Sequence, residues 1–241
     1  MTSKPSKDYL SILRPIRVCD HTLKLFRFIS TLIVAFTFIW SLVFDDKLPD
    51  ILYFSYWVIY ITLLYFLLLV GHYIYEAWSK RSFSSWFYSF TRIIGELTFS
   101  FNFLVIIFYW VWLFPGDNYT HSHANVLIFT LFLHAIVPIL VFVDQIISLI
   151  EYRKIHYIYV FATLLLYGII LLAYTKSTGT VVYKKFTFDN AFTIIAAIGA
   201  WCLSTLGFCI GCLISRIKHR CANNTSQELK VNLLECRINF I

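Results

Sequence analysis

The strongest constraint on this chain is a series of six apolar stretches, each about as long as a bilayer is thick. They cover residues 25–44, 51–74, 93–114, 124–150, 155–174 and 190–215. A helix needs about 20 mostly apolar residues to cross the hydrocarbon core. Because backbone polar groups cannot remain unpaired in lipid, each stretch is predicted to be a helix. The predicted fold class is therefore all-α: a polytopic membrane bundle of about six transmembrane helices.

The composition indicates that the bilayer is the solvent for most of the chain. Of 241 residues, 59% are hydrophobic and only 14% are charged, whereas a soluble domain is about 25% charged. No stretch is left over for a soluble domain. The predicted organisation is a basic N-terminal arm (1–24), a six-helix transmembrane domain (25–215) and a C-terminal tail (216–241).

The distribution of Lys and Arg predicts the orientation of the helices. Sixteen of these 20 residues fall in the N-terminal arm (extended to Arg27), in the loops after the second and fourth stretches, and in the tail. The other four lie on the opposite side. Because cytosolic loops carry the excess of Lys and Arg, both termini are predicted to be cytosolic, in the endoplasmic reticulum or the cell membrane. The net charge of +7 is interpreted as contact with lipid headgroups, so no nucleic acid partner is expected.

Ionisable side chains within the stretches require an explanation, because burying them in lipid costs a few kcal/mol each. His72 lies near the cytosolic end of the second stretch and is expected to reach the interface. Glu96 follows Arg92 by one turn, which favours a local ion pair. Asp144 is either a packing polar group or a link to a cytosolic Lys or Arg.

His134 differs because it lies near the middle of the fourth stretch, where both imidazole nitrogens need partners. It is either a structural hydrogen-bonding group or a general base that serves a hydroxyl. Ser55 and Thr62 of the second stretch offer hydroxyls, and by depth alone Thr62 lies closer. Either hydroxyl can instead bond along or across helices. Pro138 removes a backbone hydrogen bond to residue 134 and predicts a kink there.

Four segments, in order, resemble the androgen-induced-gene and rolling stone family of six-helix membrane proteins, over roughly residues 20 to 215. They are YFSYWVIYITLLYFLLL (Tyr53–Leu69), LHAIVPILVFVD (Leu133–Asp144), YGIILLAY (Tyr167–Tyr174) and TGTVVYKKF (Thr178–Phe186). The last is similar to a family turn in which Pro often stands at the position of Lys184. The animal members are hydrolases of fatty acid esters of hydroxy fatty acids, with an intramembrane Thr and His.

The resemblance implies an intramembrane lipid-ester hydrolase with His134 as the base. The catalytic Thr of the family aligns with Ser55, and serine keeps the hydroxyl. Thr62 is the alternative nucleophile. Asp144 is a possible supporting residue, although ten helical residues span about 15 Å, too far for a direct bond to His134. Asn102 is either an oxyanion donor or a contact between helices.

Two other functions remain open at this stage. One is a non-catalytic membrane scaffold for adhesion or fusion, as in the rolling stone branch. The other is a transporter, which would need polar groups at successive depths, and the chain has few. The sequence has no metal cluster or nucleotide-binding loop, so neither a metal nor another cofactor is expected. The expected partners are a lipid substrate and the membrane, and the sequence does not indicate whether the chain has protein partners.

Overall fold

The protein is a bundle of long helices. A computed structural model describes residues 19–44, 52–79, 84–114, 124–183, 188 and 191–238. These residues form no strand, and six of their helical segments are long and apolar enough to cross a membrane. The prediction of an all-α membrane bundle is therefore confirmed, and the chain is a multi-pass integral membrane protein.

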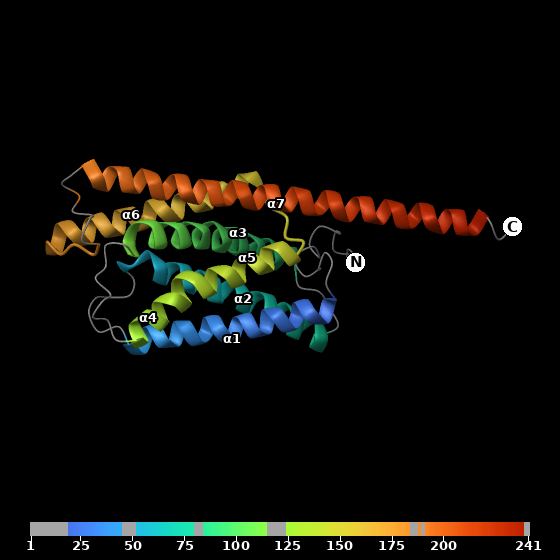
Figure 1. Ribbon diagram of the computed structural model, residues 1–241, viewed down its shortest axis with the longest axis horizontal. Coiled ribbons are helices and arrows are strands. Elements are labelled where there is room, and N and C mark those ends of the chain that lie inside the picture. Colours follow the sequence, from blue (N-terminus) through green and yellow to red (C-terminus); the bar gives the residue numbers. More distant parts are fainter. Residues whose placement is uncertain are drawn as a thin grey trace.

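The six spans run back and forth along one axis (Figure 1). They are built from α1 (Asp20–Phe44), α2 (Phe54–Ser79), α3 (Ser85–Phe108) with the π-helical turn η3 (Tyr109–Leu113), α4 (Ala124–Leu131) with the π-helical turn η6 (Phe132–Ile136) and α5 (Val137–Ile147), the short η7 (Lys154–His156) with α6 (Tyr157–Thr178), and α7 (Ala191–Ile238). With this alternation, the start of α1 and the far end of α7 lie at the same end of the bundle.

Several predicted boundaries differ from the structure, because the helices extend beyond the apolar stretches. α2 ends at Ser79 and not at residue 74, and α3 begins at Ser85 and not at residue 93. α1 begins at Asp20 and not at residue 25, and Lys24 bonds Asp20 one turn earlier at 2.5 Å. Arg27, which the charge count assigned to the arm, is fully buried. At the other end α7 continues as a helix beyond residue 215. The first 18 residues of the predicted arm lie outside the described residues.

α3 lies at the centre of the bundle and is the most buried span. It packs against α2, α5, α6 and α7. The approach of α7 depends on Gly207, because a Cβ there would lie 2.9 Å from Cβ of Phe103 and 3.1 Å from the carbonyl oxygen of Ser100. Small residues permit close helix packing in membranes, where van der Waals contact drives association. The core is therefore arranged around α3.

The segment after α6 returns to the beginning of α2. Gly179 ends α6 with a φ of 68°, a left-handed conformation that glycine adopts without strain. The chain then reverses, and the Tyr183 hydroxyl accepts a 3.0 Å hydrogen bond from the Phe54 N–H. Burial raises the pKa of the Tyr183 phenol, so its hydroxyl stays neutral. The Tyr167 hydroxyl donates to the Leu52 carbonyl at 2.9 Å, so α6 also holds the segment that leads into α2.

Candidate functional site

The central pair of the candidate site is Ser55 and His134. Ser55 lies in the first turn of α2, and its Oγ is 3.0 Å from Nε2 of His134 in the π-helical turn η6. The residues come from different spans and are separated by 79 positions. The structure thus places Ser55 against the imidazole, and the estimate from depth, which favoured Thr62, is wrong.

The imidazole is held in one tautomer. Its Nδ1 lies 3.1 Å from the carbonyl oxygen of Thr130. Because a carbonyl can only accept, Nδ1 of the neutral ring carries the proton. The lone pair of Nε2 is then directed at the Ser55 hydroxyl, which donates its proton to it. A base that must take a proton from an alcohol requires this arrangement.

Two π-helical turns shape the site. In η6 the N–H of Val137 bonds back to the carbonyl of Phe132, five residues earlier, and in η3 the N–H of Phe114 bonds in the same way to Tyr109. The Tyr109 ring stacks on the His134 ring, with centroids 3.6 Å apart and planes 14° apart. π-helical turns are uncommon and occur frequently at functional sites. The stacking restricts rotation of the imidazole.

The carbonyl of His134 has a donor from another helix. Pro138 has no N–H to offer it, and the Trp110 indole Nε1–H donates to this oxygen at 2.9 Å. The π turn η6 ends two residues before Pro138, which lies in the first turn of α5, where the sequence predicted a kink. Trp110 and Thr130 were not identified from the sequence. The only hint was that Pro138 leaves a carbonyl without its usual donor.

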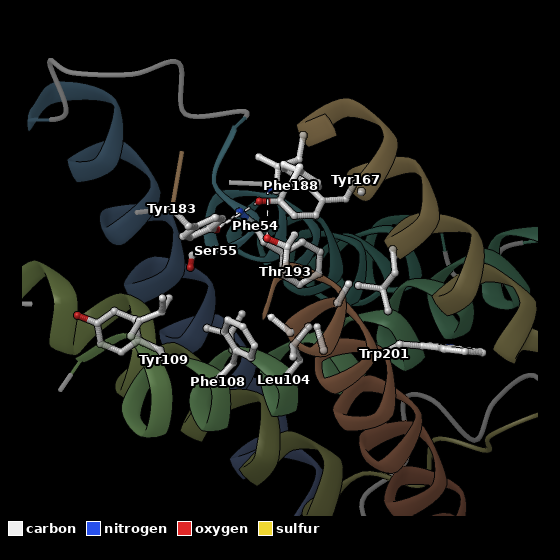
Figure 2. A pocket seen from close by; sticks show the side chains of 18 residues that line it. Phe54, Ser55, Leu104, Phe108, Tyr109, Tyr167, Tyr183, Phe188, Thr193 and Trp201 are labelled. Atoms are coloured by element: carbon white, nitrogen blue, oxygen red, sulfur yellow. Dashed lines mark hydrogen bonds between the residues drawn. The ribbon is translucent and has the colours of Figure 1, made fainter. Parts of the chain in front are cut away.

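An apolar cavity of about 170 Å³ adjoins the pair (Figure 2). Ser55 and Tyr109 line it, so the hydroxyl faces the cavity while His134 lies behind these two residues. The other walls come from α3, α6 and α7 and from the segment after α6, and none of the lining residues is charged. The geometry therefore places a hydroxyl and a base at the edge of a space suited to hydrocarbon.

Thr62 and Asn102 form a separate contact between α2 and α3. The Asn102 amide donates to the Thr62 hydroxyl at 2.9 Å and to the Thr98 carbonyl at 2.8 Å. The Thr62 hydroxyl in turn donates to the Val58 carbonyl at 2.7 Å. Both protons of the Asn102 amide are thus used, and the geometry matches the contact between helices that the sequence left open.

Asp144 belongs to a buried cluster of its own. Its carboxylate accepts from Arg27 Nε at 2.6 Å, from Arg27 Nη2 at 3.3 Å and from the Tyr65 hydroxyl at 2.5 Å. Arg27 Nη1 donates to the Tyr73 hydroxyl at 2.5 Å. Of the two readings of Asp144, the link to a basic residue is the one observed. The carboxylate does not support His134, which has the Thr130 carbonyl instead.

Glu96 and His72 both bond residues of other helical segments, which the sequence did not predict. The Glu96 carboxylate accepts from Nδ1 of His156 at 2.8 Å and from the Arg153 N–H at 3.1 Å, so it ties α3 to the connection before α6. These two bonds of Glu96 do not involve Arg92, with which the sequence favoured a local ion pair. His72 is fully buried and its Nε2 lies 3.0 Å from the Thr91 hydroxyl, so its side chain lies inside the bundle against α3 and not on the surface of α2.

The comparisons with known proteins identify no relative. No family model, curated protein or solved structure matches the chain. Among the residues that the structure describes, no group of three or more His, Cys, Asp or Glu is arranged to hold a metal ion.

Proposed function

We propose that this protein is an intramembrane hydrolase of lipid carboxylic esters, with the Ser55 hydroxyl as nucleophile and His134 as general base. The observation that carries the proposal is the 3.0 Å contact between Ser55 Oγ and His134 Nε2 beside an apolar cavity. A nucleophile and a base within hydrogen-bond reach, with the base oriented by a third group, are the usual signature of covalent catalysis. Here the third group is the Thr130 carbonyl.

The reaction follows from these positions. Ser55 Oγ attacks the carbonyl carbon of the ester while its proton passes to His134 Nε2. The bond between that carbon and the alkoxy oxygen then breaks, and the imidazolium returns the proton to the departing alcohol. Water attacks the acyl-serine with His134 again taking a proton, and the carboxylic acid leaves as Ser55 Oγ is reprotonated.

Two features of the surroundings favour these steps. The Thr130 carbonyl accepts the Nδ1–H bond, and this bond strengthens when the ring becomes positively charged. Ser55 lies in the first turn of α2, where the positive end of the helix dipole favours the negative charge that develops on the ester oxygen. The same position, close to the end of the span, gives water a short path to the acyl-serine.

The proposal extends to the substrate, the family and the orientation. The resemblance to the androgen-induced-gene and rolling stone proteins favours fatty acid esters of hydroxy fatty acids as substrates. The positive-inside count favours cytosolic N- and C-termini, in the endoplasmic reticulum or the cell membrane. In this orientation the Ser55–His134 pair lies in the half of the bilayer away from the cytosol.

A hydrolysis assay with matched variants tests the proposal. The purified full chain is incubated with a fatty acid ester of a hydroxy fatty acid, and released fatty acid is measured. We expect Ser55→Ala and His134→Ala to lower the rate by at least about 100-fold, and Thr62→Ala to leave it unchanged. A fluorophosphonate probe should label the intact chain and the Thr62→Ala variant but not Ser55→Ala.

The control has the same chemistry as the test, since Thr62→Ala also removes a hydroxyl from α2. If the intact chain and all variants release fatty acid alike, or none releases any, the hydrolase proposal is wrong. The second result would leave the non-catalytic scaffold as the better interpretation. Loss of hydrolysis in Thr62→Ala but not in Ser55→Ala would show that the nucleophile is Thr62 and not Ser55.

A further inference from the structure

The cavity beside Ser55 also indicates how a substrate is bound. We infer that it holds the first carbon atoms of a single acyl chain and that the rest of this chain leaves the protein sideways, between α6 and α7, past Gly168. The inference rests on the proposed hydrolase function, because it identifies the acyl side of the ester with this cavity. It concerns binding, so it can be tested without turnover.

The lining suits hydrocarbon and excludes a charged headgroup. None of the lining residues is charged, and burying a charge without a partner is costly. Four polar groups at the wall have hydrogen-bond partners: the Tyr183 hydroxyl accepts from the Phe54 N–H, and the Thr193 hydroxyl accepts from the Phe188 N–H. The Trp201 indole donates to the Tyr157 hydroxyl, and the Tyr167 hydroxyl donates to the Leu52 carbonyl. The Ser55 hydroxyl is bonded to the base that would activate it. The ester carbonyl is thus expected at Ser55 and an alkyl chain beyond it.

The volume limits how much of the chain fits. An engineered cavity of about 150 Å³ lined by Leu, Ile and Phe binds one benzene molecule. By the same measure the cavity here, about 170 Å³, holds about six carbon atoms. A long fatty acyl chain therefore cannot be enclosed, and its remaining carbons need a way out.

The way out lies between α6 and α7. The cavity runs from Ser55 and Tyr109 at one end to Trp201 at the other (Figure 2). Of its lining residues, Gly168 on α6 and Ala197 and Trp201 on α7 are exposed. Both helices include segments long and apolar enough to cross a membrane, so on this inference the acyl chain passes directly between cavity and bilayer.

Small residues keep this passage open. A Cβ added to Gly168 would meet no atom within 4 Å, so the space beside it is empty. On the facing helix Ala197 also contributes only a methyl group. Trp201 is held by the 2.7 Å bond from its indole N–H to the Tyr157 hydroxyl, which fixes the ring beside the opening. A large side chain at position 168 should therefore block the passage while the Ser55–His134 pair stays in place.

Photolabelling tests the binding site directly. The His134→Ala chain, which should not consume an ester, is irradiated with a fatty acid methyl ester that carries a diazirine on its chain, and labelled peptides are mapped by mass spectrometry. We expect labels on the lining stretches of α6 and α7 and their loss when Gly168→Phe is added. Gly71→Phe is the matched control, since Gly71 also has open space around it but does not line the cavity.

Hydrolysis provides the second measurement, in the chain with His134 present. Gly168→Phe should slow hydrolysis of a hexadecanoyl ester by about tenfold or more and that of a butanoyl ester of the same alcohol much less. Gly71→Phe should change neither. If Gly168→Phe does not purify as a single folded species, Ala197→Leu narrows the same passage from α7 with a smaller side chain.

The outcomes separate the two proposals. Labels elsewhere, or labels and chain-length preference that Gly168→Phe does not change, would overturn the acyl site even if Ser55-dependent hydrolysis is confirmed. Labels on α6 and α7 that Gly168→Phe removes would support the acyl site even if no ester is hydrolysed.

Discussion

The Ser55–His134 pair and the Arg27–Asp144 cluster are both buried polar groups in a membrane protein, yet they are satisfied in different ways. Asp144 receives three hydrogen bonds, from Arg27 and Tyr65, and Arg27 also bonds Tyr73. Arg27 and Asp144 are both shut off from the outside, at 0% and 1% exposure. At the other site the groups are neutral, and the Ser55 hydroxyl lines a cavity.

These differences in hydrogen bonding and in access to a cavity distinguish structural from reactive polar groups within lipid. A charge in the bilayer is costly unless partners surround it, and the Asp144 carboxylate is held beside its counter-charge by three hydrogen bonds. The Nε2 atom of His134 faces a single hydroxyl beside a cavity, so its lone pair stays available to take a proton. Burial alone is therefore not a sign of catalysis, and the presence of an adjoining space is the better criterion.

The largest effect is expected from breaking the charged cluster. Asp144→Ala leaves the buried Arg27 without its counter-charge, which should destabilise the fold by about 3–5 kcal/mol. The thermal unfolding midpoint of the purified protein in detergent should fall accordingly. Hydrolysis per folded molecule should stay unchanged, because Asp144 does not contact His134.

A double variant is the control for this prediction. Arg27→Met with Asp144→Leu removes both charges and should recover most of the lost stability, since a well-packed apolar pair can replace a buried ion pair. If the double variant is no more stable than Asp144→Ala, charge pairing is not what the cluster contributes. A loss of hydrolysis in Asp144→Ala at full folding would remove the distinction between the two regions.

An intermediate effect is expected from Trp110→Phe. The change removes the indole N–H that donates to the carbonyl of His134, at a cost of about 1–3 kcal/mol. Because the imidazole then loses a support, hydrolysis should slow by about tenfold, as small misplacements of a base do. Thermal unfolding and initial rates measure the two effects. Trp78→Phe, at an exposed position on α2, is the matched control and should change neither.

The smallest effect is expected from Thr62→Val. It removes the acceptor of the Asn102 amide and keeps the shape of the side chain, so stability should fall by about 1 kcal/mol. The rate of hydrolysis should not change. A comparison with Ser55→Ala in the same assay sharpens the contrast, because the two variants delete one hydroxyl each from the same helix. A rate that falls with Thr62→Val would place the active hydroxyl two turns deeper.

The fold could be predicted well from the sequence, and the site only in part. Six apolar stretches are sufficient to predict six helices, and the boundaries err mainly where helices continue beyond the apolar part, as at Asp20 and past residue 215. His134 stood out because an imidazole in mid-span needs partners. Its supports, the Thr130 carbonyl and the Trp110 indole, carry no such signal, since a backbone carbonyl and an aromatic side chain occur in every span.

By itself the sequence determined how many times the chain crosses the bilayer and which ionisable residues lie within the spans. These are local properties, because transfer to lipid depends on the composition of each stretch. The packing of the helices, in contrast, brings Ser55 and not Thr62 to His134, and pairs Arg27 with Asp144 across 117 residues. Such pairings depend on the rotation and tilt of whole helices, and on π turns that shift side chains by a fraction of a turn, and depth along the axis does not specify them.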